Sequence, residues 1–170
     1  MANVFDKFVG DKHVVCESSL LKATGTGHIL SLKAHKDMDN GSIVSRGSFV
    51  EAQVFNSKNY VEGEAPLLVL TTPIGYNSDR KSYQDECYFF NAAGEIMRAY
   101  ELCENDIFTV SDIAITAMGA APVVGNYVSV SDGMYVETAS AGAGFVGQII
   151  EKVTYTNSVS YRILVVSTGI

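Results

Sequence analysis

The residues that come closest to a chemical motif are the glycines of G-A-G-F-V-G at positions 142–147. The spacing G-x-G-x-x-G binds a dinucleotide pyrophosphate when it ends a strand, opens a helix and precedes an acidic residue about 20 positions later. The residues after Gly147 have the composition of strands instead. We therefore predict no nucleotide site, and interpret these glycines as a bend where a strand turns or another backbone comes close.

Two other groups of residues raise the question of a metal site. The segment D-M-D-N-G at 37–41 begins like a calcium loop, but an EF-hand needs glycine at its sixth position and glutamate at its twelfth. Here glycine is fifth and Ser48 is twelfth. His13, His28 and His35 do not have the i, i+2 or i, i+4 spacing of paired zinc ligands. The sequence therefore predicts a solvated turn at 37–41, with no metal and no other cofactor.

Catalytic groups are equally hard to assemble. Cys16, Cys87 and Cys103 are odd in number, lie far apart and contain no C-x-x-C, so we expect three reduced thiols that pack as small hydrophobic groups. The acidic pairs and clusters at 85–86 and 101–106 are typical of solvated loops at strand ends. No nucleophile, base and orienting group can be named together, so we predict that the protein is not an enzyme.

Charge is concentrated in the first two-thirds of the chain. The charged residues from position 107 onward are Asp112, Asp132, Glu137, Glu151, Lys152 and Arg162. We expect this charge-poor part to form strands covered on both faces, by a core and by another protein. The whole chain has 12 Lys and Arg against 19 Asp and Glu, a net charge of -7, which disfavours nucleic acid and anionic membranes as partners.

Neither the longest uncharged run nor the N-terminal segment has the composition of a membrane-spanning or targeting sequence. The uncharged run 113–131 is interrupted by Gly119, Pro122 and Gly125, so we do not expect it to span a membrane. The first residues lack the apolar stretch of a secretory signal, and none is expected.

Strand signals are dense along the chain. The apolar run at 65–73 is expected to be a buried central strand. Four hairpins are predicted: 28–34 with 42–45 around Asn40-Gly41, one within 87–102 around Gly94, 126–130 with 134–138 around Asp132-Gly133, and 145–156 with 160–167 around 156–158. Strands at such close spacing predict an all-β fold, a small β-barrel or sandwich.

The domain organisation follows from composition. Residues 1–27 are predicted to form an N-terminal extended arm, which either folds onto the body or reaches a neighbouring subunit. Residues 28–170 form the β domain, with its charge-poor part at about 105–170. Helix formation competes only at 18–23, which is too short to stand alone, and at 113–121, which ends before a proline.

Several segments in the middle of the chain resemble one protein family. They are D-N-G-S-I-V-S-R-G at 39–47, L-L-V-L-T-T-P-I-G-Y-N at 67–77, N-A-A-G-E-I-M-R-A-Y-E-L at 91–102, N-D-I-F-T-V-S at 105–111 and F-V-G-Q-I-I-E-K-V at 145–153. Their order resembles the small auxiliary head proteins of tailed bacteriophages, the capsid decoration or cement proteins. The likeness covers roughly residues 35–165 as a pattern of turns and strand starts.

This resemblance implies a β-tulip-like body and a structural role in the virion. A decoration protein binds the outer surface of the expanded capsid and clamps neighbouring major capsid subunits, here as a homotrimer on threefold axes. It would be made in the host cytoplasm and reside on the virion. The residues we expect at the capsid or subunit interface are Val4, Phe5, Phe8, Gly142, Gly144 and Phe145.

Two alternatives remain open from the sequence. The chain is also compatible with the base of a head fibre or a tail-associated adaptor, in which the C-terminal half forms a trimer and the arm docks to the particle. It is further compatible with a small carbohydrate-binding β-module. The aromatic side chains that would stack on a sugar in that case are Tyr76, Tyr83, Tyr88 or Tyr135.

Overall fold

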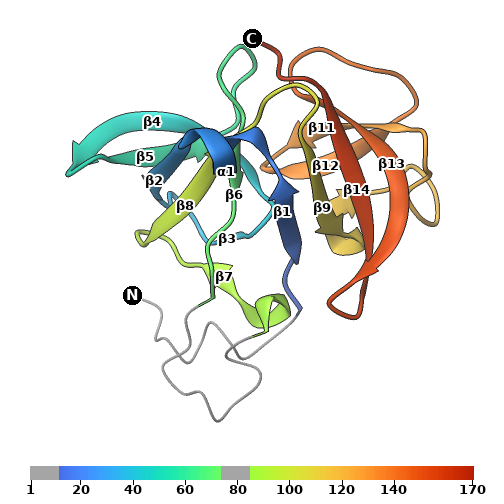
Figure 1. The fold of residues 1–170 in the computed structure, drawn as a ribbon, viewed down its shortest axis with the longest axis horizontal. Coiled ribbons are helices and arrows are strands. Elements are labelled where there is room, and N and C mark those ends of the chain that lie inside the picture. Colours follow the sequence, from blue (N-terminus) through green and yellow to red (C-terminus); the bar gives the residue numbers. More distant parts are fainter. Residues whose placement is uncertain (1–11, 74–84) are drawn as a thin grey trace.

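The structure, a computed structural model, describes residues 12–73 and 85–170. It is an all-β fold in which a closed barrel lies beside a larger curved sheet (Figure 1). The prediction of an all-β protein with a small β-barrel is confirmed. The single α-helix among the described residues, α1 (Lys22–Thr26), connects the first strand of the sheet to the first strand of the barrel.

The barrel has five strands. In the order in which they hydrogen-bond, they are β2 (Ile29–Lys33), β5 (Val54–Asn59), β4 (Ile43–Glu51), β6 (Leu67–Val69) and β8 (Ile96–Glu101). β8 pairs with β2 and closes the ring, and β2 runs parallel to β5. Since side chains alternate along a strand, every second residue points inward, and the interior is filled by apolar groups such as Leu32, Val44 and Met97.

The second sheet has seven strands. They are, in spatial order, β1 (Cys16–Leu20), β9 (Ile107–Ser111), β14 (Ser158–Ser167), β13 (Val146–Tyr155), β11 (Tyr127–Ser131), β12 (Met134–Thr138) and β10 (Ile115–Thr116). The charge-poor part of the chain therefore supplies every strand of this sheet except β1. Smaller elements complete the fold: β3 (Met38–Asp39) pairs with β7 (Phe90–Asn91), and η3 (Glu86–Tyr88) and η4 (Asp112–Ala114) are 3-10 turns.

The main hydrophobic core lies between the barrel and the sheet. Ile43 and Leu68, which point out of the barrel, belong to the same buried cluster as Phe108 and Tyr135 from the sheet. The Tyr135 hydroxyl donates to the Gly41 carbonyl at 2.7 Å, which joins the two parts across the core. Shared core and direct hydrogen bonds make the barrel and sheet one body.

The described part of the predicted arm, residues 12–27, is not an extension. Val14, Val15 and Cys16 are at most 3% exposed, and β1 pairs with β9. Burial of this apolar stretch, together with Asp39, which accepts a hydrogen bond from the Val14 amide at 3.1 Å, holds it in the body. Of the two possibilities the sequence left open, these residues fold onto the body.

Two predicted hairpins are confirmed. β11 and β12 are joined by Asp132-Gly133, with φ of 50° and 88°, and β13 and β14 by Thr156-Asn157, with φ of 45° and 61°. Positive φ at both central residues is the conformation that gives a two-residue turn the twist of the flanking strands.

The other two hairpin predictions are wrong. β2 and β4, on either side of Asn40-Gly41, do not pair, because the Asn40 side chain is fully buried and bonds to Thr71 and Asn91 instead of completing a surface turn. Within 87–102, β7 pairs with β3 while β8 joins the barrel. Of the predicted buried strand at 65–73, residues 66–69 are buried, Thr72 is exposed, and only Leu67–Val69 is paired as a strand.

Candidate functional site

A loop on the sheet is organised by one buried carboxylate. Glu137 lies near the end of β12, and alternation along that strand turns it inward like Tyr135 two residues earlier. Its side chain, in a residue only 2% exposed, accepts hydrogen bonds from the Met118 and Val123 amides, both at 2.8 Å, and from the Asn126 side chain at 2.7 Å. The carboxylate therefore fixes both ends of the loop at 118–124.

The pKa of Glu137 shows which effect dominates around it. Burial raises the pKa of this carboxyl, but the hydrogen bonds from Met118, Val123 and Asn126 together outweigh burial, so the net pKa is lowered. Glu137 is consequently ionised at neutral pH, and the loop is held by charge-assisted hydrogen bonds, which are stronger than neutral ones.

The loop presents apolar side chains to solvent. Met118 is 57% exposed, Val123 is 55% and Val124 is 50%, and residues 119–121 between them are exposed Gly and Ala. No charged residue lies between Asp112 and Asp132. A rigid, uncharged, exposed apolar segment is suited to packing against another macromolecule rather than to binding or converting a small polar substrate.

The predicted interface residues are only partly at the surface. Gly142 is exposed. Gly144, with φ of 72°, touches the C-terminal segment so closely that a Cβ on Gly169 would lie 2.5 Å from the Gly144 Cα. The interpretation of these glycines as a bend where another backbone approaches is confirmed, and β13 rather than a helix follows.

Phe145 does not have the surface position expected of an interface residue. Its side chain is 1% exposed and packs near Tyr135 in the main core, with 6.5 Å between ring centroids. The Phe145 amide donates to the Tyr60 hydroxyl at 2.9 Å, which fixes the ring inward. The prediction of a contact through this ring is corrected. Val4, Phe5 and Phe8 lie outside the described residues.

The described tyrosines among those predicted to stack on a sugar are also buried or half-buried. Tyr135 is fully buried, so no ligand can reach its ring. Tyr88 is half-buried and packs against Phe89. Tyr76 and Tyr83 lie outside the described residues.

The thiols are protected from nucleophilic roles. Burial raises the pKa of Cys16 well above its ordinary value and that of Cys87 to about 11, and it also raises the pKa of Cys103. All three are therefore protonated thiols at neutral pH, and a thiol is a poor nucleophile compared with a thiolate.

Glu86 is a second carboxylate inside the fold, and its net pKa is raised, whereas that of Glu137 is lowered. Its Oε1 accepts from the Cys16 amide and from the Asn40 side chain, both at 3.1 Å. Burial raises its pKa by more than these two hydrogen bonds lower it. It connects β1 to the buried Asn40, a structural role.

Across residues 12–73 and 85–170, no group of three or more His, Cys, Asp or Glu is arranged to hold a metal ion. The same residues contain no helix long and apolar enough to cross a membrane. Comparisons with protein-family models, with curated proteins and with solved structures gave no match.

Sequence reasoning missed the loop at 118–124. Its signal is the uncharged run 113–131, whose composition was interpreted in terms of membrane insertion, helix formation and a hairpin strand rather than as an exposed apolar loop. The lone Glu137 within an apolar strand was the second available signal, since a buried carboxylate must be hydrogen-bonded.

Proposed function

We propose that the chain is a virion structural protein that decorates the expanded capsid of a tailed bacteriophage and stabilises it by clamping major capsid subunits. The observation behind this proposal is the exposed apolar loop at 118–124, fixed by Glu137 on a rigid all-β body. The resemblance of residues 35–165 to capsid decoration proteins supplies the identity of the partner.

The physical case rests on how such a loop would bind. Burying exposed apolar surface is favourable by about 25 cal/mol per Å². A loop whose backbone is already fixed loses less conformational entropy on binding than a flexible one, so more of that gain appears as affinity. The net charge of -7 also keeps the protein from adhering to DNA during assembly.

A clamp must contact more than one capsid subunit, and a homotrimer on a threefold axis presents three copies of the loop. Once one loop of the trimer is bound to the particle, the other two loops are held near their own binding sites, so their effective concentration there is high. This arrangement provides strong attachment from a small apolar surface on each protomer.

The proposal is tested by co-sedimentation with heads of the phage that encodes the chain, in expanded and unexpanded form. We expect the protein to sediment with expanded heads only. Met118→Glu and Val123→Glu should each weaken binding about tenfold or more, because each places a charge in an apolar interface. Thr154→Glu, on an exposed part of β13, is the matched control. Equal binding of all variants, or equal binding to unexpanded heads, would contradict the proposal.

The predicted contacts at Val4, Phe5 and Phe8 need a separate truncation. Removing residues 1–11 leaves β1 and α1 intact, whereas removing all of 1–27 would delete parts of the core. A clamp through 118–124 should then retain part of its capsid binding. Complete loss of attachment, with the trimer preserved by light scattering, would instead favour the adaptor alternative.

A further inference from the structure

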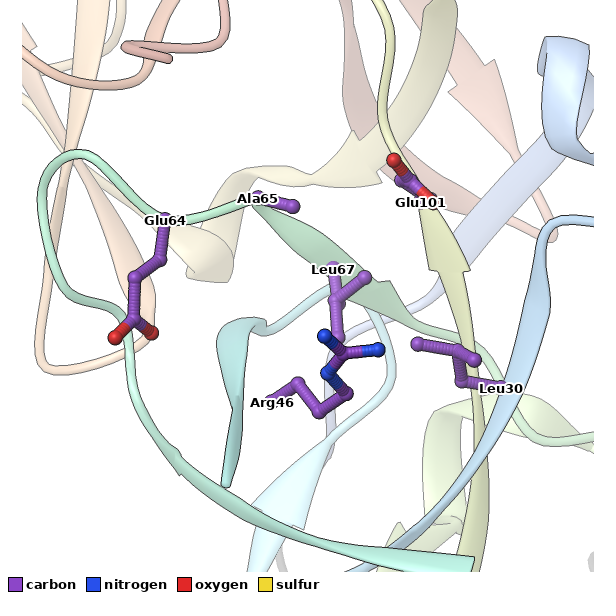
Figure 2. Close-up of a pocket in the computed structure, with 6 residues that line it drawn as sticks. All are labelled: Leu30, Arg46, Glu64, Ala65, Leu67 and Glu101. Carbon is purple, nitrogen blue, oxygen red and sulfur yellow. The ribbon is translucent and has the colours of Figure 1, made fainter. Parts of the chain in front are cut away.

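The open end of the barrel contains a pocket that the decoration role does not use. It has a volume of about 430 Å³. The residues that line it are Leu30, Arg46, Glu64, Ala65, Leu67 and Glu101, contributed by β2, β4, β6, β8 and the segment before β6 (Figure 2). It thus combines a small apolar surface with one guanidinium and two carboxylates.

Arg46 is available to a ligand. Its guanidinium carbon lies 5.2 Å from the centre of the Phe55 ring, which supports the side chain. Within the described residues its guanidinium forms no ion pair and no hydrogen bond, and Figure 2 shows it in the middle of the pocket. Its N–H donors can therefore be directed at a bound molecule.

The two carboxylates provide acceptors on either side of Arg46. Glu64 is paired with Lys58 at 2.6 Å, and that hydrogen bond holds its pKa below the ordinary value. Glu101 accepts from His28 Nδ1 at 3.0 Å through Oε2, and no hydrogen bond within the described residues uses its Oε1. Both carboxylates are positioned by other partners and keep capacity to accept from a ligand.

A bulge in β4 adds an aromatic side chain to the same face. Arg46 is opposite Ser57 and Phe49 is opposite Phe55, so Arg46 and Phe49 share a face although they are three positions apart in the sequence. Gly47 permits the irregular register, since a Cβ there would lie 2.9 Å from a backbone oxygen of β5. Phe49 is 62% exposed and packs edge-on against Phe55, with 5.6 Å between centroids.

The mixture of charges indicates the class of ligand. An anion near Arg46 would also approach Glu64 and Glu101, and a cation near the carboxylates would approach Arg46. A neutral molecule with many hydroxyl groups can accept hydrogen bonds from the guanidinium and donate them to the carboxylates. It meets neither the repulsion that the carboxylates exert on an anion nor the repulsion that Arg46 exerts on a cation. Its C–H surface would pack on the half-buried Leu30 in the pocket and on the exposed Phe49, which lies beside the pocket next to Phe55. We propose that the barrel mouth binds a neutral saccharide, a site separate from the 118–124 loop.

Saturation-transfer NMR on the full chain tests this proposal. The probes are maltose, cellobiose, lactose and chitobiose, with glucuronate and glucosamine as charged comparisons, all at millimolar concentration. At least one neutral disaccharide should bind, and more tightly than either charged sugar. Absence of binding by the whole neutral panel, or preference for a charged sugar, would overturn the proposal.

Variants locate the binding site. Phe49→Ala should leave the fold intact, because the ring is exposed, and should weaken binding about tenfold, as should Arg46→Lys, which keeps the charge but loses the planar donor set. Arg162→Met removes an exposed arginine on the sheet and should have no effect. Unchanged sugar binding in both barrel variants would refute the assignment. So would loss of capsid binding in these variants without any sugar binding, which would make the barrel mouth a protein contact.

Discussion

Replacing Glu137 by alanine should release the 118–124 loop and lower the stability of the whole protein. The substitution removes three hydrogen bonds to a charged group. Hydrogen bonds to charged groups contribute about 1.5–3 kcal/mol each. Because Met118 and Val123 are near solvent, water can satisfy part of what is lost, so we expect a decrease of about 3 kcal/mol in the free energy of unfolding. For a chain of this size that lowers Tm by roughly 6–12 °C.

Glu137→Gln removes the negative charge of the side chain and keeps its shape, so it measures the contribution of the charge to stability. The glutamine keeps one carbonyl oxygen for Val123 and Asn126 but directs an NH₂ group toward the Met118 amide, so two donors face each other. We expect a smaller loss, about 1–2 kcal/mol. The control is Glu151→Ala, which removes an exposed ion pair with Arg162 and should change stability by less than about 1 kcal/mol.

Denaturant unfolding gives the stability of each variant, and hydrogen exchange followed by NMR reports on the loop itself. In Glu137→Ala the Met118 and Val123 amides should lose their protection, whereas amides of the barrel should change only with global stability. Loop amides that stay as protected as in the wild type, together with a loss no larger than that of Glu151→Ala, would refute the role assigned to Glu137.

The pH dependence provides a further check on the same carboxylate. The pKa of Glu137 is lowered in the folded state from an ordinary value of 4.5, so its stabilisation is present above about pH 4.5. That stabilisation is lost as the pH falls through the lower folded value. The stability difference between wild type and Glu137→Gln should therefore shrink below pH 4.5.

Three other substitutions test the fold around the two sites. Tyr135→Phe should cost about 1–3 kcal/mol in denaturant unfolding, since the Gly41 carbonyl loses its partner in the core; no change would contradict a structural role for that hydrogen bond. Gly147→Ala should cost about 1–3 kcal/mol, because a Cβ would lie 2.4 Å from Ile163, and a thermally unaltered variant would disprove this close packing. Glu86→Gln keeps the oxygen that both donors use. Since the folded pKa of Glu86 is raised, the wild type should lose stability relative to this variant as pH rises above 4.5, and parallel pH profiles would contradict that assignment.

The parts of the fold that sequence predicted well were set by local chemistry. Asp132-Gly133 and Thr156-Asn157 occupy positive φ in two-residue turns, and the strands beside them are adjacent in sequence. Such hairpins depend on the turn residues and the immediate apolar pattern alone. The charge-poor part of the chain does form strands, but the expectation that both faces are covered is not met in this structure, since Ile150, Val159 and Val166 on the sheet are exposed.

The failures came from contacts between distant residues. Asn40-Gly41 has a hairpin sequence, yet Asn40 is buried and bonds to residues far along the chain. The actual turn between β4 and β5 uses Ala52-Gln53 at φ of 43° and 69°, residues with no strong preference for that conformation. No local pattern indicates that β2 pairs in parallel with β5.

In the candidate sites, too, the features set by local sequence were predictable and those set by contacts between distant residues were not. Gly142 and Gly144 were correctly interpreted as a backbone bend, but whether Phe145 faces inward depends on the Tyr60 hydroxyl and the core behind it. The barrel pocket could not be predicted because its residues come from four separate stretches of the sequence. Gly47 within a strand was the one local signal there, since glycine in a strand often marks a bulge.

A cryo-electron microscopy map of expanded heads incubated with the protein tests the central claim most directly. The proposed function predicts density for the protein on the outer surface, at threefold positions, with residues 118–124 packed between or against major capsid subunits. Heads without added density would contradict the decoration role. Bound protein with this loop facing solvent would contradict the interface assigned to it.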